Sequence, residues 1–154
     1  MKRIISFVLL CTLFVFAGCG EAQDPAENNA SVSFQVLDGV SRMPAAACKN
    51  VLPEYKKELL TGSDGKTEAA EIAVLYDTHF ADIHLQEYGT FTVLAYKEGY
   101  SDYALFFAQI RENQERNIKV YMFMKDTPMS NGAPLATVES PEKEWVKELV
   151  EQYR

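Results

Sequence analysis

The chain has 154 residues, with 15 Lys and Arg against 22 Asp and Glu, and 47% of its residues are hydrophobic. Nine Phe, eight Tyr and one Trp supply enough apolar bulk for a packed core, which excludes a wholly disordered protein. The net charge of -7 argues against a nucleic-acid surface, which needs a basic patch. Three cysteines are too few for a disulfide framework or a four-thiolate zinc site.

The N-terminal residues have the layout of a secretory signal peptide. Lys2 and Arg3 precede an apolar run over residues 4–16, which is followed by the small residues Ala17 and Gly18. The run is about 13 residues long, shorter than the roughly 20 residues that a membrane-spanning helix needs. The segment therefore predicts export and cleavage in place of a transmembrane anchor.

The end of this segment points to a lipid anchor. Residues 16–19, Phe-Ala-Gly-Cys, resemble the lipobox of bacterial lipoproteins, in which a peptidase cleaves before a cysteine that has received a diacylglycerol. The resemblance implies that residues 1–18 are removed, that Cys19 carries the lipid and that the membrane is a partner of the mature chain. The alternative is a secreted protein with Cys19 left as a free thiol. Lipidation would leave Cys48 as the one thiol of the mature chain.

Residues 19–30 predict a disordered tether. They contain no large apolar side chain and are rich in acidic residues, asparagine and alanine. A flexible segment of this length has a root-mean-square reach of about 15–20 Å. Anionic lipids would repel its carboxylates, so the segment is expected to hold the following domain away from the lipid headgroups.

Residues 31–125 predict an all-β domain. Alternating apolar and polar residues, β-branched residues and aromatic residues indicate extended segments, and 55–61 fits a strand or a helix. Short strands about ten residues apart, with glycine turns such as 62–65 between them, predict one β-sandwich of about seven strands. The expected strands cover residues 31–36, 49–52, 71–76, 90–96, 103–110 and 118–124, and a polar loop is expected at 111–117.

The C-terminal residues predict a linker and then a helix. Residues 126–140 are rich in Pro, Gly and Ser, which favours a linker. Residues 141–153 predict a short amphipathic α-helix, with Ser140 as its N-cap and Pro141 in its first turn. One apolar stripe follows at helical spacing and contains Trp145, Val146, Leu149, Val150 and Tyr153.

This apolar stripe has two interpretations. It either completes the core at one end of the sandwich or docks in a groove of a partner protein, with Trp145, Leu149 and Tyr153 as the contacts. The polar face of the helix carries more Glu than Lys, which argues against membrane contact because interfacial helices are usually basic.

Several segments resemble carboxypeptidase regulatory-like domains. Residues 89–93, Gly-Thr-Phe-Thr-Val, match that family's G-x-[YF]-x-V strand, and Gly99-Tyr100 matches the Gly-Tyr pair that follows it. Residues 61–66 are similar to its T-D-x-x-G turn, and residues 36–51 are similar to its first strand and P-x-x-A connection. The resemblance implies a transthyretin-like β-sandwich that serves as a non-catalytic accessory domain.

The matched residues are expected to build the fold. Phe91 and Val93 should point into the core, and Gly99 should make a turn that a β-carbon would not tolerate. Tyr100 should lay its ring on the sandwich edge, with its hydroxyl hydrated or capped. Three further aromatic residues, Tyr96, Tyr121 and Phe123, are expected in the inner layer of the core; the alternative is an exposed platform for carbohydrate or peptide.

No segment of the sequence has the pattern of a catalytic centre, so an enzyme is not expected. Residues 77–84, Asp-Thr-His-Phe-Ala-Asp-Ile-His, offer two imidazoles and two carboxylates that could ligate zinc. The His79–His84 spacing fits neither one face of a strand nor the i, i+4 positions of a helix, which favours a solvated loop and no metal site. Cys48 lacks a partner pair typical of a nucleophile and is expected as a buried hydrophobe or an idle surface thiol.

The sequence as a whole predicts an extracytoplasmic lipoprotein anchored to the cell membrane. Its expected role is that of a non-enzymatic protein-binding or adhesion module that contacts another envelope protein and needs no cofactor. One alternative is a carbohydrate- or cell-wall-glycan-binding module, and another is a structural spacer in an envelope complex.

Overall fold

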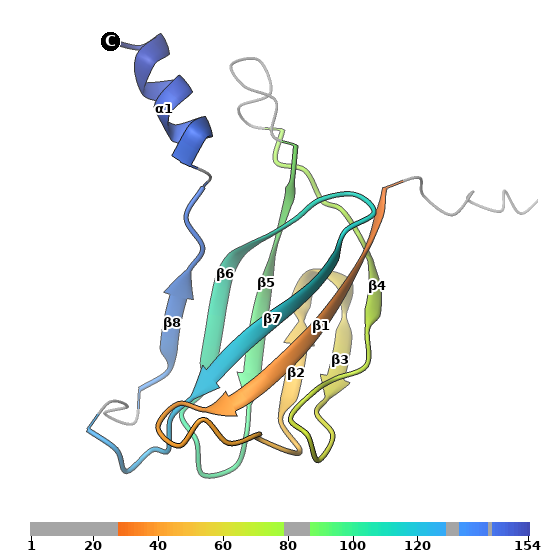
Figure 1. Cartoon of the computed structure of the whole chain (residues 1–154), viewed down its shortest axis with the longest axis vertical. Coiled ribbons are helices and arrows are strands. Elements are labelled where there is room, and N and C mark those ends of the chain that lie inside the picture. Colours follow the sequence, from red (N-terminus) through yellow and green to blue (C-terminus); the bar gives the residue numbers. More distant parts are fainter. Residues whose placement is uncertain (1–27, 79–86, 129–132, 142) are drawn as a thin grey trace, which may run out of the picture.

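The computed structural model describes residues 28–78, 87–128, 133–141 and 143–154. Strands dominate these residues, and one short α-helix follows them (Figure 1). The elements in chain order are β1 (Asn29–Asp38), β2 (Lys49–Leu52), the 3-10 turn η1 (Pro53–Tyr55), β3 (Lys57–Leu60), β4 (Ala70–Ala73), β5 (Gly89–Tyr96), β6 (Tyr103–Ile110), β7 (Glu115–Met122), β8 (Leu135–Val138) and α1 (Lys143–Gln152).

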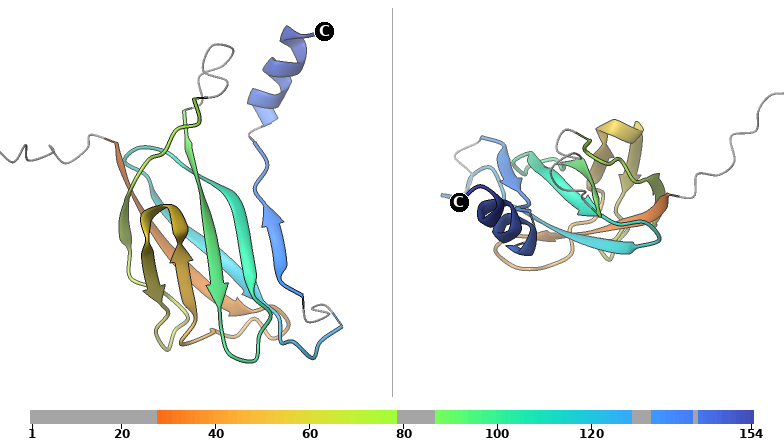
Figure 2. Two further views of the ribbon diagram at one scale, coloured as in Figure 1. Left: turned by 180° about the vertical axis from the view of Figure 1, so that it is seen from behind. Right: turned by 90° about the horizontal axis from the view of Figure 1, so that it is seen from above.

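The strands form two sheets that pack face to face as a β-sandwich (Figure 2). One sheet has three strands in the order β4-β1-β7, and the other has five in the order β3-β2-β5-β6-β8. β1 pairs in parallel with β7, and β6 pairs in parallel with β8, whereas the other pairs are antiparallel. The predicted β-sandwich with a C-terminal helix is confirmed.

The core lies between the two sheets and follows the predicted alternation. Val32, Phe34 and Val36 of β1 are fully buried, and so are Phe91 and Val93 of β5. In β1 and β5 every second side chain is buried. This alternation is expected for a pleated strand with one face covered. Burial of these side chains is the main term that stabilises the sandwich.

Tyr100 occupies the predicted place at the edge of the sandwich. Its hydroxyl donates a 3.0 Å hydrogen bond to Asp38, whose other carboxylate oxygen accepts from the backbone N–H groups of Val40 and Ser41. The Ser41 backbone hydrogen bond is the main cause that lowers the pKa of Asp38. The preceding Gly99 has the expected left-handed turn conformation, φ +79°, but no atom lies within 4 Å of the position of a β-carbon, so the turn does not exclude one by contact.

Several strand boundaries differ from the prediction. β1 begins at Asn29, inside the predicted tether, and continues to Asp38, and β7 ends at Met122. The ambiguous residues 55–61 contain the end of η1 and then β3, because Lys56 takes a left-handed conformation (φ 52°) that separates the two. β4 stops at Ala73, earlier than expected. β7 starts at Glu115, inside the expected loop, because parallel pairing with β1 begins at Ser31 opposite Glu115.

The segment 126–140, predicted as a linker, contains the strand β8. Leu135 pairs with Tyr103 and Val138 with Phe106, so β8 adds a parallel edge to the five-stranded sheet. The prediction was wrong here because a four-residue edge strand forms by pairing with the neighbouring strand. Its own composition does not show this pairing.

The inner-layer prediction for three aromatic residues was also wrong. Tyr96 is 37% exposed, and Tyr121 and Phe123 are half-buried. Tyr121 lies under the guanidinium group of Arg42, with 4.5 Å between the Arg42 Cζ atom and the ring centroid. These residues alternate with core residues of β5 and β7, so they face outwards from the sandwich.

Helix α1 covers residues 143–152 of the predicted 141–153, but it does not complete the core. None of its residues is buried, and it extends beyond the end of the sandwich (Figures 1 and 2). The interpretation in which its apolar stripe closes the sandwich is therefore wrong. No helix within the described ranges is long and apolar enough to span a membrane.

Candidate binding site beside the β6 bulge

A β-bulge in β6 brings two aromatic side chains to the surface. Phe91 pairs with Ala108 and Val93 with Leu105, so Phe106 and Phe107 together stand opposite a single residue of β5. Phe107 has φ 58°, a left-handed conformation that is rare for a bulky residue. The two phenylalanines are 40% and 58% exposed, respectively.

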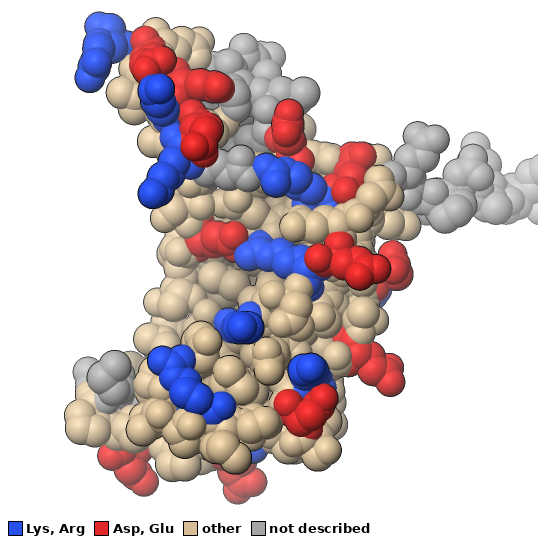
Figure 3. Space-filling view, in the orientation of Figure 1, with Lys and Arg blue, Asp and Glu red and all other residues tan. Residues whose placement is uncertain are grey.

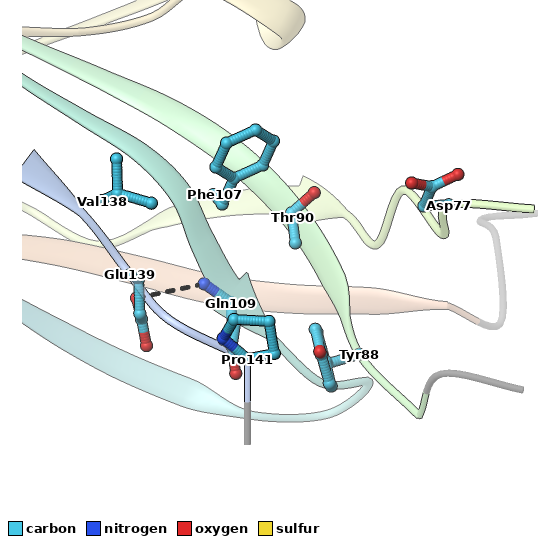
Figure 4. Close-up of a pocket in the computed structure, with 8 residues that line it drawn as sticks. All are labelled: Asp77, Tyr88, Thr90, Phe107, Gln109, Val138, Glu139 and Pro141. Carbon is cyan, nitrogen blue, oxygen red and sulfur yellow. Dashed lines mark hydrogen bonds between the residues drawn. The ribbon is translucent and has the colours of Figure 1, made fainter. Parts of the chain in front are cut away.

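Phe107 forms one wall of a pocket of about 300 Å³ (Figure 4). Strands β5 and β6 form its floor, and the chain between β8 and α1 forms another wall. The lining is mainly apolar and includes carboxylates at two positions. The lining residues are Asp77, Tyr88, Thr90, Phe107, Gln109, Val138, Glu139 and Pro141.

A cluster of polar contacts, here called the Glu139 clamp, holds that second wall in place. Both carboxylate oxygens of Glu139 accept hydrogen bonds from Arg116 Nη2, at 2.9 and 2.8 Å, and one also accepts from the backbone N–H of Gln109. The Gln109 side-chain amide donates to the carbonyl of Ser140 at 2.7 Å, and Arg116 donates to the Gln109 carbonyl. Because Arg116 and Glu139 are only 23% and 29% exposed, water screens the ion pair little.

The clamp also borders a second, more polar hollow of about 250 Å³. Tyr88, Gln109 and Glu139 line both hollows, so the apolar and polar spaces are neighbours at one end of β6. The polar hollow adds Ile110, Arg111, Gln114 and Arg116. An apolar side chain with a polar neighbour would fit this pair of hollows.

The partner contacts predicted from the sequence do not line this pocket. Trp145 and Leu149 are half-buried on α1, and Tyr153 after it is 67% exposed. Phe107, Val138 and Glu139 were missed. The run Leu105-Phe106-Phe107-Ala108 breaks the period of two, and this break was the available sign of a bulge.

Two predicted features lie outside the described residues. Cys19 belongs to residues 1–27, and His79, Asp82 and His84 belong to residues 79–86. Among the residues that are described, no group of three or more His, Cys, Asp or Glu side chains could hold a metal ion.

Cys48 is a buried core residue, in agreement with one of the two expectations. Its Sγ lies 3.3 Å from Met122 Sδ, and burial raises the pKa of its thiol to about 11. Only the thiolate reacts quickly with disulfide reagents, so Cys48 is doubly protected.

We expect the native protein with Cys11 and Cys19 replaced by serine, in which Cys48 is the one thiol, to react with an aromatic disulfide reagent at pH 8 far more slowly than the same protein in denaturant. The rate should follow the unfolding equilibrium, because the thiol becomes accessible only when the sheets separate. A time course monitored by thiolate release checks this. Rapid labelling without denaturant would contradict the burial of Cys48.

Comparisons with known proteins identify similar structures but no family. No family model matches the chain, and no curated protein sequence matches it. One similar chain comes from a type II cohesin–X-dockerin complex of Acetivibrio cellulolyticus, a C-terminal interface mutant (16% identity, TM-score 0.46, covering 64% of this chain and 60% of that chain). A chain from the N-terminal interface mutant of that complex has 16% identity and a TM-score of 0.41, covering 63% and 58%.

A third similar chain is described as a membrane-associated protein of unknown function from Bacteroides fragilis. It shares 13% identity with a TM-score of 0.40, and the match covers 67% of this chain and 30% of that one. The chain thus spans less than two thirds of the length of each of these structures. The β-sandwich assignment rests on the strand pairing described above.

Proposed function

We propose that the chain is an extracytoplasmic lipoprotein, anchored through Cys19, whose sandwich is a non-catalytic module that binds a protein partner. The lipobox-like residues 16–19 support the anchor. The observation that carries the binding role is the strained Phe107 at the β6 bulge. A left-handed phenylalanine costs about 1–2 kcal/mol, and such strain persists mainly where a site uses it.

The bulge achieves something that a regular strand could not. In a regular strand, one of two successive residues faces the core, whereas the bulge lets both Phe106 and Phe107 face outwards. Phe107 then stands over the pocket together with Val138 and Pro141. The result is an aromatic surface beside an apolar hollow, which suits an apolar side chain of a partner protein.

The polar groups of the pocket favour a protein over a sugar. A sugar ring needs several hydrogen-bond partners, but the Glu139 carboxylate and the Gln109 side-chain amide are already engaged in the clamp. An apolar side chain makes no such demand and gains from leaving water.

The Phe107→Gly variant tests this role. Glycine adopts the left-handed conformation without strain, so the relief offsets the lost packing of a side chain that is already 58% exposed. We expect the free energy of unfolding to stay within about 1 kcal/mol of the parent value, whereas a buried phenylalanine lost from a core costs about 3–5 kcal/mol. Partner binding should fall at least tenfold.

The binding measurement needs an identified partner. A photo-crosslinking amino acid at Val138, at the pocket wall, would capture it in cells, and mass spectrometry would identify it. Binding of the purified partner to parent and variant is then measured by calorimetry. Tyr96→Ala, which removes an exposed aromatic side chain on another strand, is the matched control and should bind normally. Undiminished binding by Phe107→Gly would contradict the proposal.

One observation favours a second candidate function. Phe106 and Phe107 form an exposed aromatic pair, and such pairs can stack on sugar rings, so a cell-wall-glycan-binding module is the alternative. Saturation-transfer NMR with soluble wall fragments distinguishes it. Transfer to a glycan that is lost in Phe107→Gly, with no protein captured at Val138, would replace the protein partner by a glycan.

A further inference from the structure

The N-terminal segment joins the sandwich at the end that carries the loop between β6 and β7, which connects the two sheets. The backbone N–H of Asn113 in that loop donates to the carbonyl of Asn29 at 2.8 Å, and the backbone N–H of Ser31 donates to the carbonyl of Gln114 at 2.9 Å. The first described residue, Asn28, therefore lies at this end. With a lipid on Cys19, this end is the one nearest the membrane.

The C-terminal helix leaves from the same end. β8 runs parallel to β6, and the Glu139 clamp fixes the following residues beside Gln109, one residue before β6 ends. Helix α1 then continues beyond the sandwich, past the end where β1 begins (Figure 1). Two segments that are far apart in the sequence thus emerge at one end of the fold.

The apolar stripe of α1 is only partly covered: Trp145 and Leu149 are half-buried and the Trp145 indole nitrogen is buried, whereas the rest of the stripe is exposed. Val146 is 40% exposed, Val150 is 53% exposed and Tyr153 is 67% exposed. A helix of ten residues is marginal in water by itself and is stabilised mainly when its apolar face packs against something. The position of α1 therefore raises the question of which surface covers the exposed part of this stripe.

We propose that α1 lies on the surface of the lipid bilayer and buries its apolar stripe at the interface. This inference rests on the proposed lipid anchor. Nine residue steps separate Cys19 from Asn28, so the extended tether reaches about 30 Å. Helix α1 is about 15 Å long and projects from the membrane-proximal end, which places it within that reach.

The aromatic residues of the stripe suit this location. Tyr153 is 67% exposed and combines an apolar ring with a polar hydroxyl group, and the half-buried Trp145 lies near the other end of the stripe. Such side chains are favoured at the boundary between hydrocarbon and water. Val146, Leu149 and Val150 between them would supply the apolar contact.

The charges of α1 determine which lipids it meets. Figure 3 shows basic and acidic side chains side by side on the helix. Residues 143–154 contain three basic and three acidic residues, so their side chains carry no net charge: Lys143, Lys147 and Arg154 against Glu144, Glu148 and Glu151. The helix therefore gains little from anionic lipids, and its contact should occur on neutral phosphatidylcholine and change little with salt.

The polar face had argued against membrane contact when the sequence was considered alone. That argument concerns electrostatic attraction of a free helix to a membrane. A helix held near the bilayer by a neighbouring lipid anchor needs only a weak affinity, because tethering makes its binding intramolecular, with an effective concentration in the millimolar range. The shared exit end of the two segments supplies this proximity.

Trp145 offers a direct test, because it is the one tryptophan of the chain. The lipidated full-length mature protein is reconstituted into phosphatidylcholine vesicles that contain brominated acyl chains. Flotation of the vesicles reports the anchor, and quenching of Trp145 fluorescence reports the helix. We expect flotation together with quenching of at least one third of the emission, unchanged between 0.05 and 0.5 M salt.

Two pairs of substitutions on α1 separate the stripe from the rest of the helix. Val146→Glu with Val150→Glu should reduce the quenching of Trp145 to the level seen for free indole mixed with the same vesicles. Flotation should persist, because both valines are exposed and the anchor is intact. Lys147→Ala with Glu151→Ala is the matched control. It removes an exposed pair 3.9 Å apart on the opposite face and should leave quenching unchanged.

The outcomes distinguish the inference from the proposed function. Flotation without quenching would overturn the membrane contact of α1 and leave the anchor standing. Loss of flotation in Cys19→Ala supports the anchor, whereas unprocessed protein without a lipid would overturn the anchor and the inference with it. Shielding of Trp145 only after addition of a purified envelope protein would assign the stripe to that protein and overturn the lipid contact.

Discussion

Replacing Gly65 by alanine is expected to lower the free energy of unfolding by about 2–5 kcal/mol. Gly65 has φ +72°, and a β-carbon there would lie 2.6 Å from the carbonyl oxygen of Val36. Val36 also donates its backbone N–H to the Gly65 carbonyl at 2.8 Å, so the turn sits directly against β1. Alanine would therefore add conformational strain and push the turn away from a central strand.

The chain provides a matched control at Gly99. This glycine has nearly the same conformation, φ +79°, but no atom lies within 4 Å of the position that a β-carbon would take. Gly99→Ala should cost only the left-handed strain, about 1–2 kcal/mol. Urea denaturation followed by circular dichroism measures both variants. Equal losses would show that the close approach to Val36 carries no cost.

The second large effect is expected for the Glu139 clamp. Arg116→Ala leaves the Glu139 carboxylate partly buried without its guanidinium partner and should lower the free energy of unfolding by about 2 kcal/mol. The substitution should also weaken the local attachment of β8 to β6. Hydrogen exchange of the Glu139 amide, which is bonded to the Phe106 carbonyl at 3.1 Å, should become faster because β8 separates from β6.

An exposed ion pair on another strand is the control for this prediction. Lys49 and Glu58 are 3.6 Å apart and 47% and 64% exposed, so Glu58→Ala should change stability by no more than about 0.5 kcal/mol. In the double variant of Arg116 and Glu139, part of the loss should be recovered, since no unpaired charge remains. Unchanged exchange at Glu139 in Arg116→Ala would show that the clamp does not hold β8.

The strand pattern explains how much of the fold was predictable. Val32, Phe34 and Val36 alternate with polar residues, and this local period sufficed to predict β1 and the face that it buries. Phe91 and Val93 in β5 were predictable for the same reason. Each case depends on a repeat inside one strand, which the sequence displays without knowledge of the neighbouring strands.

The parts that were missed depend on contacts between distant residues. β8 exists because Leu135 and Val138 meet Tyr103 and Phe106 of β6, and the composition of 126–140 does not reveal this pairing. The Glu139 clamp joins residues 23 positions apart. The site at Phe107 therefore escaped prediction, although the uninterrupted apolar run 105–108 was visible.

The helix shows a different limit of sequence reasoning. Helical spacing correctly predicted α1 and its apolar stripe. The spacing does not show which surface the stripe contacts. The direction in which α1 leaves the sandwich is set by the Glu139 clamp and β8. That direction could not be read from Trp145, Leu149 or Tyr153 themselves.

The parallel pairing of β1 with β7 has a mechanical consequence. β1 lies between β4 and β7, and it is matched to β7 at eight successive positions from Ser31 to Asp38. In a chain anchored at Cys19, a pull on the sandwich would enter at Asn28 and act along the axis of β1. The ladder hydrogen bonds run across that axis. They would be loaded in shear, so many of them would have to break together before β1 could be pulled out of its sheet.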